Sequence, residues 1–183
     1  MIPQSVLKYV EKEGCGAFVG LEAPRPTAGS IAKCRGYCEE NLCGHHSTNW
    51  GCPPYVGTPE ECVDLCNSYD SCTLVTIPFD CDPEDEEAVE STMARAQGIG
   101  REIKRLLLDE GIDALVLADG PCQHCGRCAA LDGEPCRHPE RRVPSVSAFG
   151  ILVNDYLERV GIAVNPERMC LYCFALTRDR TPL

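Results

Sequence analysis

The sequence predicts a small layered α/β domain with a mostly buried sheet, helices packed on it and cysteine-rich metal-binding loops at one edge. Helical and strand-like segments alternate along the chain. Residues 112–119 (IDALVLAD) form an uninterrupted apolar run that is typical of a central strand buried on both faces, and the cysteines gather in local groups. With 183 residues, the chain 1–183 is expected to form a single domain.

The first third of the chain shows few signals of regular structure. Residues 2–13 are expected to form a short helix or strand, and the glycine-rich stretch 14–20 interrupts it. The segment 34–52 (CRGYCEENLCGHHSTNWGC) has no apolar periodicity. We therefore expect this segment to become ordered only by binding a ligand such as a metal.

The middle of the chain carries stronger signals. A helix is predicted over 58–68, because it starts with a threonine N-cap, a proline and two acidic residues. The apolar, β-branched run 72–79 predicts a strand. A second helix is predicted over 82–109, with Gly98 and Gly100 as points where it could bend or split.

The C-terminal part continues the alternation. The strand predicted over 112–119 leads directly into the cysteine-rich segment 122–136. A third helix is predicted over 146–160, and a last strand over 168–177.

The most informative motif is the spacing C-x2-C-x2-C-x7-C. Its members are Cys122, Cys125, Cys128 and Cys136. A single zinc ion is usually held by two separated C-x2-C pairs, whereas a cubane cluster accepts three ligands from one loop and a fourth from further along. The spacing therefore favours a 4Fe–4S cluster, with zinc as the alternative.

A second cysteine group has a looser spacing, C-x3-C-x4-C-x8-C. It consists of Cys34, Cys38, Cys43 and Cys52. It differs from the C-x3-C-x2-C spacing of radical-SAM enzymes, and it is interpreted as a second 4Fe–4S site. His45 and His46 could instead complete a zinc site. Cys52 precedes a proline as in bacterial ferredoxins, so Cys52 and Cys136 could be exchanged between the two sites.

The remaining cysteines are expected to be mainly small core residues. Cys62 and Cys66 lie four residues apart on one face of the predicted helix, with Cys72 close behind, so these three could form a third site or add a ligand. Cys170 and Cys173 would point to opposite faces of a strand, which opposes chelation. No role is assigned to Cys15 and Cys81.

Basic side chains and histidines surround the first motif. His124 and His138 could orient the loop by hydrogen bonds or donate protons beside a redox centre. Arginines are expected to stabilise a cluster charge of about −2 rather than to bind an anionic substrate. They are Arg127, Arg137, Arg141 and Arg142.

Composition excludes several classes of protein. The net charge is −11, and the acidic run 80–90 would suit a basic partner protein or simply form a solvated helix start. No basic stripe for nucleic acid and no apolar run long enough for a membrane helix occurs. The chain opens without a signal peptide, and its fifteen cysteines are an odd number in tight local groups, so a reducing cytoplasm is expected.

Several motifs together resemble a known family. The 122–128 cysteines, the block 136–140 (CRHPE), Pro144-Ser145 and the element Cys52-Pro53-Pro54 resemble the predicted metal-binding proteins of domain-of-unknown-function family 2284 over roughly residues 30–177. The resemblance implies a cysteine-rich, iron–sulfur protein of prokaryotes with no settled activity. The cysteines flanking Tyr172 depart from the family's usual aromatic last strand, which leaves a ligand role for Cys170 or Cys173 open.

These patterns lead to one functional interpretation and two alternatives. The leading interpretation is a cytosolic protein that binds two 4Fe–4S clusters and transfers electrons to or from a redox partner protein, with no active-site nucleophile of its own. A reductase or desulfidase would instead need a cluster with an open iron, and hence only three cysteines at one site. The third interpretation is a zinc-stabilised interaction module.

Overall fold

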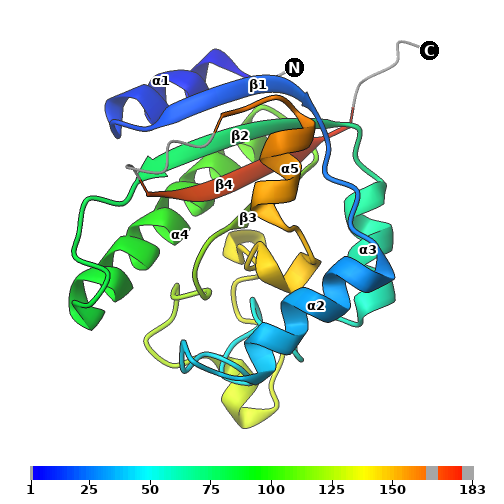
Figure 1. Cartoon of the computed structure of the whole chain (residues 1–183), viewed down its shortest axis with the longest axis vertical. Coiled ribbons are helices and arrows are strands. Elements are labelled where there is room, and N and C mark those ends of the chain that lie inside the picture. Colours follow the sequence, from blue (N-terminus) through cyan, green and yellow to red (C-terminus); the bar gives the residue numbers. More distant parts are fainter. Residues whose placement is uncertain (1, 164–168, 179–183) are drawn as a thin grey trace.

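The computed structural model describes residues 2–163 and 169–178 and contains a four-stranded antiparallel sheet (Figure 1). The strand order in space is β1-β2-β4-β3. The strands are β1 (Gly16–Glu22), β2 (Ser71–Pro78), β3 (Ala114–Ala118) and β4 (Cys170–Thr177). The α-helices are α1 (Gln4–Lys12), α2 (Ala28–Glu39), α3 (Pro59–Asn67), α4 (Glu86–Asp109) and α5 (Val153–Arg159). Three short 3₁₀ helices are η1 (Ala129–Asp132), η2 (Pro139–Arg141) and η3 (Ser147–Phe149).

Helices cover both faces of the sheet and give it two apolar cores. On one face, α1 and α4 pack against alternate residues of the strands, among them Val75, Val116 and Ala175. On the other face, α3, α5 and η3 pack against the intervening residues, among them Leu74 and Phe174. Because both faces are covered, the strands read as nearly continuous apolar runs. The predicted layered α/β fold is confirmed.

The elements with strong local signals form where they were predicted. At the start of α3, the Thr58 side chain accepts a hydrogen bond from the Glu61 backbone, and Glu61 caps Thr58 in return. Helix α4 runs through Gly98 and Gly100 without interruption. Close packing explains the glycine at position 100, because a Cβ there would lie 3.3 Å from the Cβ of Ala118. Helix and strand can therefore approach closely.

Four predictions about the elements need correction. The run 112–119 forms β3, but this strand lies at an edge of the sheet and not at its centre. Residues 34–39 are helical, because α2 starts at a capping box between Thr27 and Ser30 that the sequence analysis overlooked. Strand β1 occupies the glycine-rich stretch that was expected to interrupt regular structure. The helix predicted over 146–160 is divided into η3 and α5, with Gly150 in the left-handed conformation (φ +70°) between them.

Among residues 2–163 and 169–178, none of the helices is both long enough and apolar enough to cross a bilayer.

Candidate metal centre

The two cysteine-rich segments, 34–52 and 122–136, come together beyond the carboxyl end of β3. Gly51 packs directly on Cys122, since a Cβ on Gly51 would lie only 2.6 Å from the Cβ of Cys122. The Trp50 indole nitrogen donates a hydrogen bond to the Glu134 carbonyl at 3.0 Å. Only glycine permits this approach at position 51, so the backbone itself joins the two segments.

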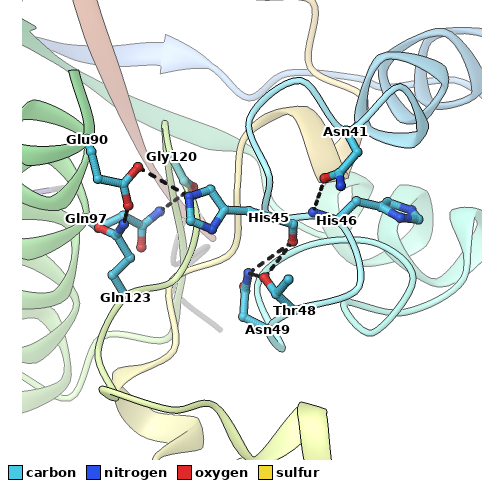
Figure 2. Close-up of polar contacts among 9 residues, drawn as sticks. All are labelled: Asn41, His45, His46, Thr48, Asn49, Glu90, Gln97, Gly120 and Gln123. Carbon is cyan, nitrogen blue, oxygen red and sulfur yellow. Dashed lines mark hydrogen bonds and ion pairs between the residues drawn. The ribbon is translucent and has the colours of Figure 1, made fainter. Parts of the chain in front are cut away.

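A carboxylate on α4 also links the segments (Figure 2). One Glu90 oxygen lies 3.3 Å from the Nε2 atom of His45, and the other accepts a hydrogen bond from the Gln123 side chain. Glu90 belongs to the acidic run 80–90, which the sequence analysis interpreted as a solvated helix start or a partner surface. At this position the run instead connects the 34–52 segment, α4 and the 122–136 segment.

The turn that leaves β3 is held by Gln97 (Figure 2). This side chain is fully buried on α4, and its nitrogen lies within 3.4 Å of the carbonyl oxygens of Ala118, Asp119 and Gly120. Gly120 has φ +86°, a conformation that favours glycine. Sequence analysis missed Gln97, and its only signal was a polar residue on the apolar face of a predicted helix.

The four cysteines of the first motif surround one small pocket. Cys122, Cys125, Cys128 and Cys136 line it together with Trp50, His124, His138 and Arg142. Cys136 lines this pocket with the other three cysteines of its segment, whereas Cys52 lines the neighbouring cavity. The pocket measures about 20 Å³, and the four cysteines are half-buried. Four thiols are the right donor set for a cluster or for zinc, although the pocket itself is smaller than a cubane cluster.

Three cysteines of the second group line a larger cavity of about 360 Å³ beside the first pocket. They are Cys38, Cys43 and Cys52. Asp119, Met93 and Leu171 also line it. Cys52 is 8% exposed, and burial raises its pKa to about 11. A bound cation would lower that pKa, because it stabilises the thiolate.

The fourth cysteine of this group, Cys34, does not line the cavity. It is buried on α2, one helical turn before Cys38, and its thiol interacts electrostatically with Cys38, Lys33 and Asp155. Burial raises the pKa of the Cys34 thiol. The structure thus brings together three of the four cysteines that the spacing grouped.

His45 and His46 line the same cavity as the three cysteines. The Nε2 atom of His45 faces Glu90, and the Nδ1 atom of His46 lies 3.1 Å from the Ser47 hydroxyl. The His46 backbone nitrogen also donates to the Asn41 side chain (Figure 2). Both histidines therefore have polar partners within the structure, and the expectation that they could complete a zinc site stays a prediction.

Asp119 presents a carboxyl group to this cavity from the end of β3. Its Oδ2 atom accepts a hydrogen bond from the Tyr172 backbone at 2.8 Å. Burial nevertheless raises the pKa of Asp119 from 3.8 to about 6. The group can therefore hold or release a proton near neutral pH. Sequence analysis did not single out Asp119.

The raised pKa predicts a pH dependence of stability. Between pH 4 and 6 the folded chain binds the Asp119 proton more tightly than the unfolded chain, so stability falls as pH rises through this window. Asp119→Asn, which can still accept from Tyr172, should remove this slope. From pH 5 to pH 7.5, the wild type should lose about 1 kcal/mol more unfolding free energy than the variant. Urea unfolding at the two pH values measures the difference, and equal losses would contradict it.

The third possible thiol group, Cys62, Cys66 and Cys72, lies in the apolar core. Burial raises the pKa of Cys66 and of Cys72 to about 12, which keeps both as neutral thiols. Cys62 accepts a hydrogen bond from Arg35 at 3.2 Å, and Cys66 donates to the Pro24 carbonyl at 3.6 Å. These contacts are those of packed core residues.

The other cysteines lie away from both cavities. Cys173 is fully buried under α4, where its sulfur packs near Gly100. Cys170 is half-buried at the start of β4. Cys15 and Cys81 are also half-buried, and the Cys81 sulfur lies 3.5 Å from the Thr92 hydroxyl.

Positive charge is distributed unevenly around the four-cysteine pocket. Arg142 lines it, while Arg127 pairs with Asp132 at 2.6 Å and Arg137 donates to the Arg127 carbonyl. Lys104 of α4 donates to the carbonyl of Arg142 at 2.8 Å. Burial lowers the pKa of Lys104, and the nearby Arg142 lowers it further. Arg142 is therefore the cation best placed to balance thiolate charge.

His124 and His138 meet in an edge-to-face contact with ring centroids 4.9 Å apart, beside the four cysteines. Burial lowers the pKa of His124, and the positive charges of Arg101, His138 and Arg141 lower it further. His124 is consequently a neutral imidazole over most of the physiological range.

In the described part of the chain, no group of three or more His, Cys, Asp or Glu residues is arranged so that it could hold a metal ion. The candidate sites are therefore defined by which cysteines line a common cavity.

The comparison with protein families shows which family the chain belongs to. The model of the family described as "Predicted metal-binding protein (DUF2284)" matches residues 27–175. The chain belongs to this family. Neither the curated proteins nor the solved structures compared with the chain gave a match.

The DUF2284 match spans both cysteine segments and the strands and helices that hold them. The resemblance expected from the cysteine motifs is thereby confirmed. Family membership identifies a predicted metal-binding protein, and the cysteines are this chain's most abundant metal-ligating side chains outside the acidic residues.

Proposed function

We propose that this DUF2284 protein is a cytosolic iron–sulfur protein that holds two 4Fe–4S clusters and transfers electrons. Cys122, Cys125, Cys128 and Cys136 would hold one cluster, and Cys38, Cys43 and Cys52 the other. The clusters would supply one-electron chemistry. The protein's own side chains would anchor the iron atoms, limit access of water and balance charge.

The observation that carries the proposal is the arrangement of thiols around two adjacent cavities. Cys38, Cys43 and Cys52 line a space of about 360 Å³, which is wider than the coordination sphere of one ion. Cys52 also lies close enough to Cys122 for their charges to interact. Two clusters held by neighbouring thiols would be close enough to exchange electrons within one chain.

The proposal is tested by measuring metal and acid-labile sulfide in protein purified without oxygen from its native host. About eight iron and eight sulfide per chain, with broad absorbance near 400 nm, is the expected result. One or two zinc ions without sulfide would contradict the redox proposal and support the zinc-stabilised interaction module.

A second candidate function is a reductase or desulfidase with an open iron site. The specific observation in its favour is that Cys34 lies outside the cavity, so only three cysteines face it. A cluster held by three thiolates leaves one iron without a cysteine ligand. Asp119, which lines the same cavity, could hold a proton for a reduced substrate.

The proposed redox partner is a basic protein. The first turn of α4 carries the exposed acidic residues Glu86 and Glu87, and Asp85 caps the helix through the Ala88 backbone. These carboxylates would attract a positively charged surface. Glu90 is excluded from this role, because it is engaged with His45 and Gln123.

A further inference from the structure

A third cavity, of about 420 Å³, lies on the other side of His124 from the four cysteines. It is lined by α4 and by the segment that includes η2, and its basic residues Arg101 and Arg141 both interact electrostatically with His124. Its volume is in the range that holds small organic molecules. No cysteine lines it, so it is separate from the proposed cluster sites.

The charge of this cavity is not balanced by its own carboxylates. Arg105 is fully occupied, because it binds Glu102 at 2.6 Å and also Asp109. The Arg141 Nε atom lies 3.9 Å from Glu140, which is a loose pair. Arg101 forms no ion pair with any residue in the ranges 2–163 and 169–178.

Arg101 also has an unsatisfied donor. Its Nη1 atom is buried and lacks a hydrogen-bond partner among the residues that the structure describes. Because Nη1 is closed off from the cavity, an oxyanion there would be bound through the Nε and Nη2 atoms of Arg101, which also have no hydrogen-bond partner in the described part of the chain and are not buried. Arg101 does not line the four-cysteine pocket, whereas Arg142 does. Arg101 is therefore poorly placed to neutralise a cluster and well placed to bind a ligand.

From this geometry, we propose that the cavity binds a small organic molecule with a carboxylate or phosphate group, held by Arg101 and Arg141. The apolar side of the ligand would lie on Leu108 and on the α4 backbone at Gly98. His124 lines both this cavity and the four-cysteine pocket, so the bound anion would be one side chain away from the proposed cluster. The site does not depend on the identity of the metal.

The test is calorimetric titration of the metal-loaded protein with phenyl phosphate, benzoate and neutral benzamide. At least one of the two anions should bind with a stoichiometry of one, and benzamide at least tenfold more weakly. Which anion binds more tightly distinguishes phosphate from carboxylate recognition. Failure of both anions to bind, or equal binding of benzamide, would overturn the proposal.

Variants separate the site from general charge effects. Arg101→Gln should weaken anion binding at least tenfold, whereas Arg95→Gln, which changes the same charge on α4 outside the cavity, should leave it unchanged. Glu140→Gln should tighten binding, because it removes a competing carboxylate from the lining. Binding by Arg101→Gln equal to the wild type, or weaker binding by Glu140→Gln, would contradict the proposal. Loss of metal would not accompany either variant, so failure here leaves the iron–sulfur proposal intact.

Discussion

Replacing Cys125 by serine is expected to remove about half of the iron and sulfide from the protein, because one of two cubane clusters would lose a thiolate ligand. Cys125 lines the four-cysteine pocket and is half-buried, so the substitution leaves both apolar cores unchanged. Iron and sulfide per chain, measured on protein purified without oxygen, give the result directly.

The matched control is Cys170→Ser. Cys170 is also half-buried, but it lies at the start of β4 and lines neither cysteine cavity. The Cys170→Ser protein should therefore retain the full content of iron and sulfide. Full iron and sulfide in Cys125→Ser would show that the four-cysteine pocket is not a cluster site, and an equal loss in Cys170→Ser would show that the loss is not specific to that pocket. The second outcome would also give Cys170 the ligand role that the departure from the family pattern left open.

The second large effect is expected from a comparison of Cys52 with Cys34. Both cysteines are almost fully buried, at 8% and 4% exposure, so their substitutions disturb the core to a similar degree. Cys52 lines the larger cavity and Cys34 does not. Cys52→Ser should therefore lose about half of the iron, whereas Cys34→Ser should keep nearly all of it.

Electron paramagnetic resonance of the reduced proteins adds the decisive detail. In Cys34→Ser, the spectra of both clusters should remain, which would support the proposed assignment of three cysteines to the second cluster and leave one of its irons without a cysteine ligand. Loss of one spectrum in Cys34→Ser as well as in Cys52→Ser would instead indicate four cysteine ligands. Electron transfer without an open iron would then be the better interpretation.

Local signals were sufficient for several elements of the fold. The N-cap, the proline and the acidic first turn predict α3, and the structure places its first residue at Pro59. The β-branched run predicts β2 within a residue at each end. Such features act over one turn of helix or a few residues of strand, so the sequence near them contains all the information that is needed.

Local signals did not predict which strands pair with each other in the sheet. An apolar run indicates that β3 is buried on both faces, but burial comes from helices above and below and does not require strands on both sides. Strand β1 forms because β2 offers it a pairing edge, with Phe18 opposite Leu74, despite its glycines. Its own residues would have favoured a turn.

For the candidate site, the amino-acid sequence alone was enough to identify the cysteine groups and the family. C-x2-C-x2-C is a local constraint on a short loop, and the structure keeps Cys122, Cys125, Cys128 and Cys136 around one pocket. The packing of elements distant in the chain leaves Cys34 outside the cavity that Cys38 lines, and it places Asp119 and Arg101 beside cavities. Spacing determines which thiols could share a metal, whereas the direction in which a helix packs determines which side chains face the same space.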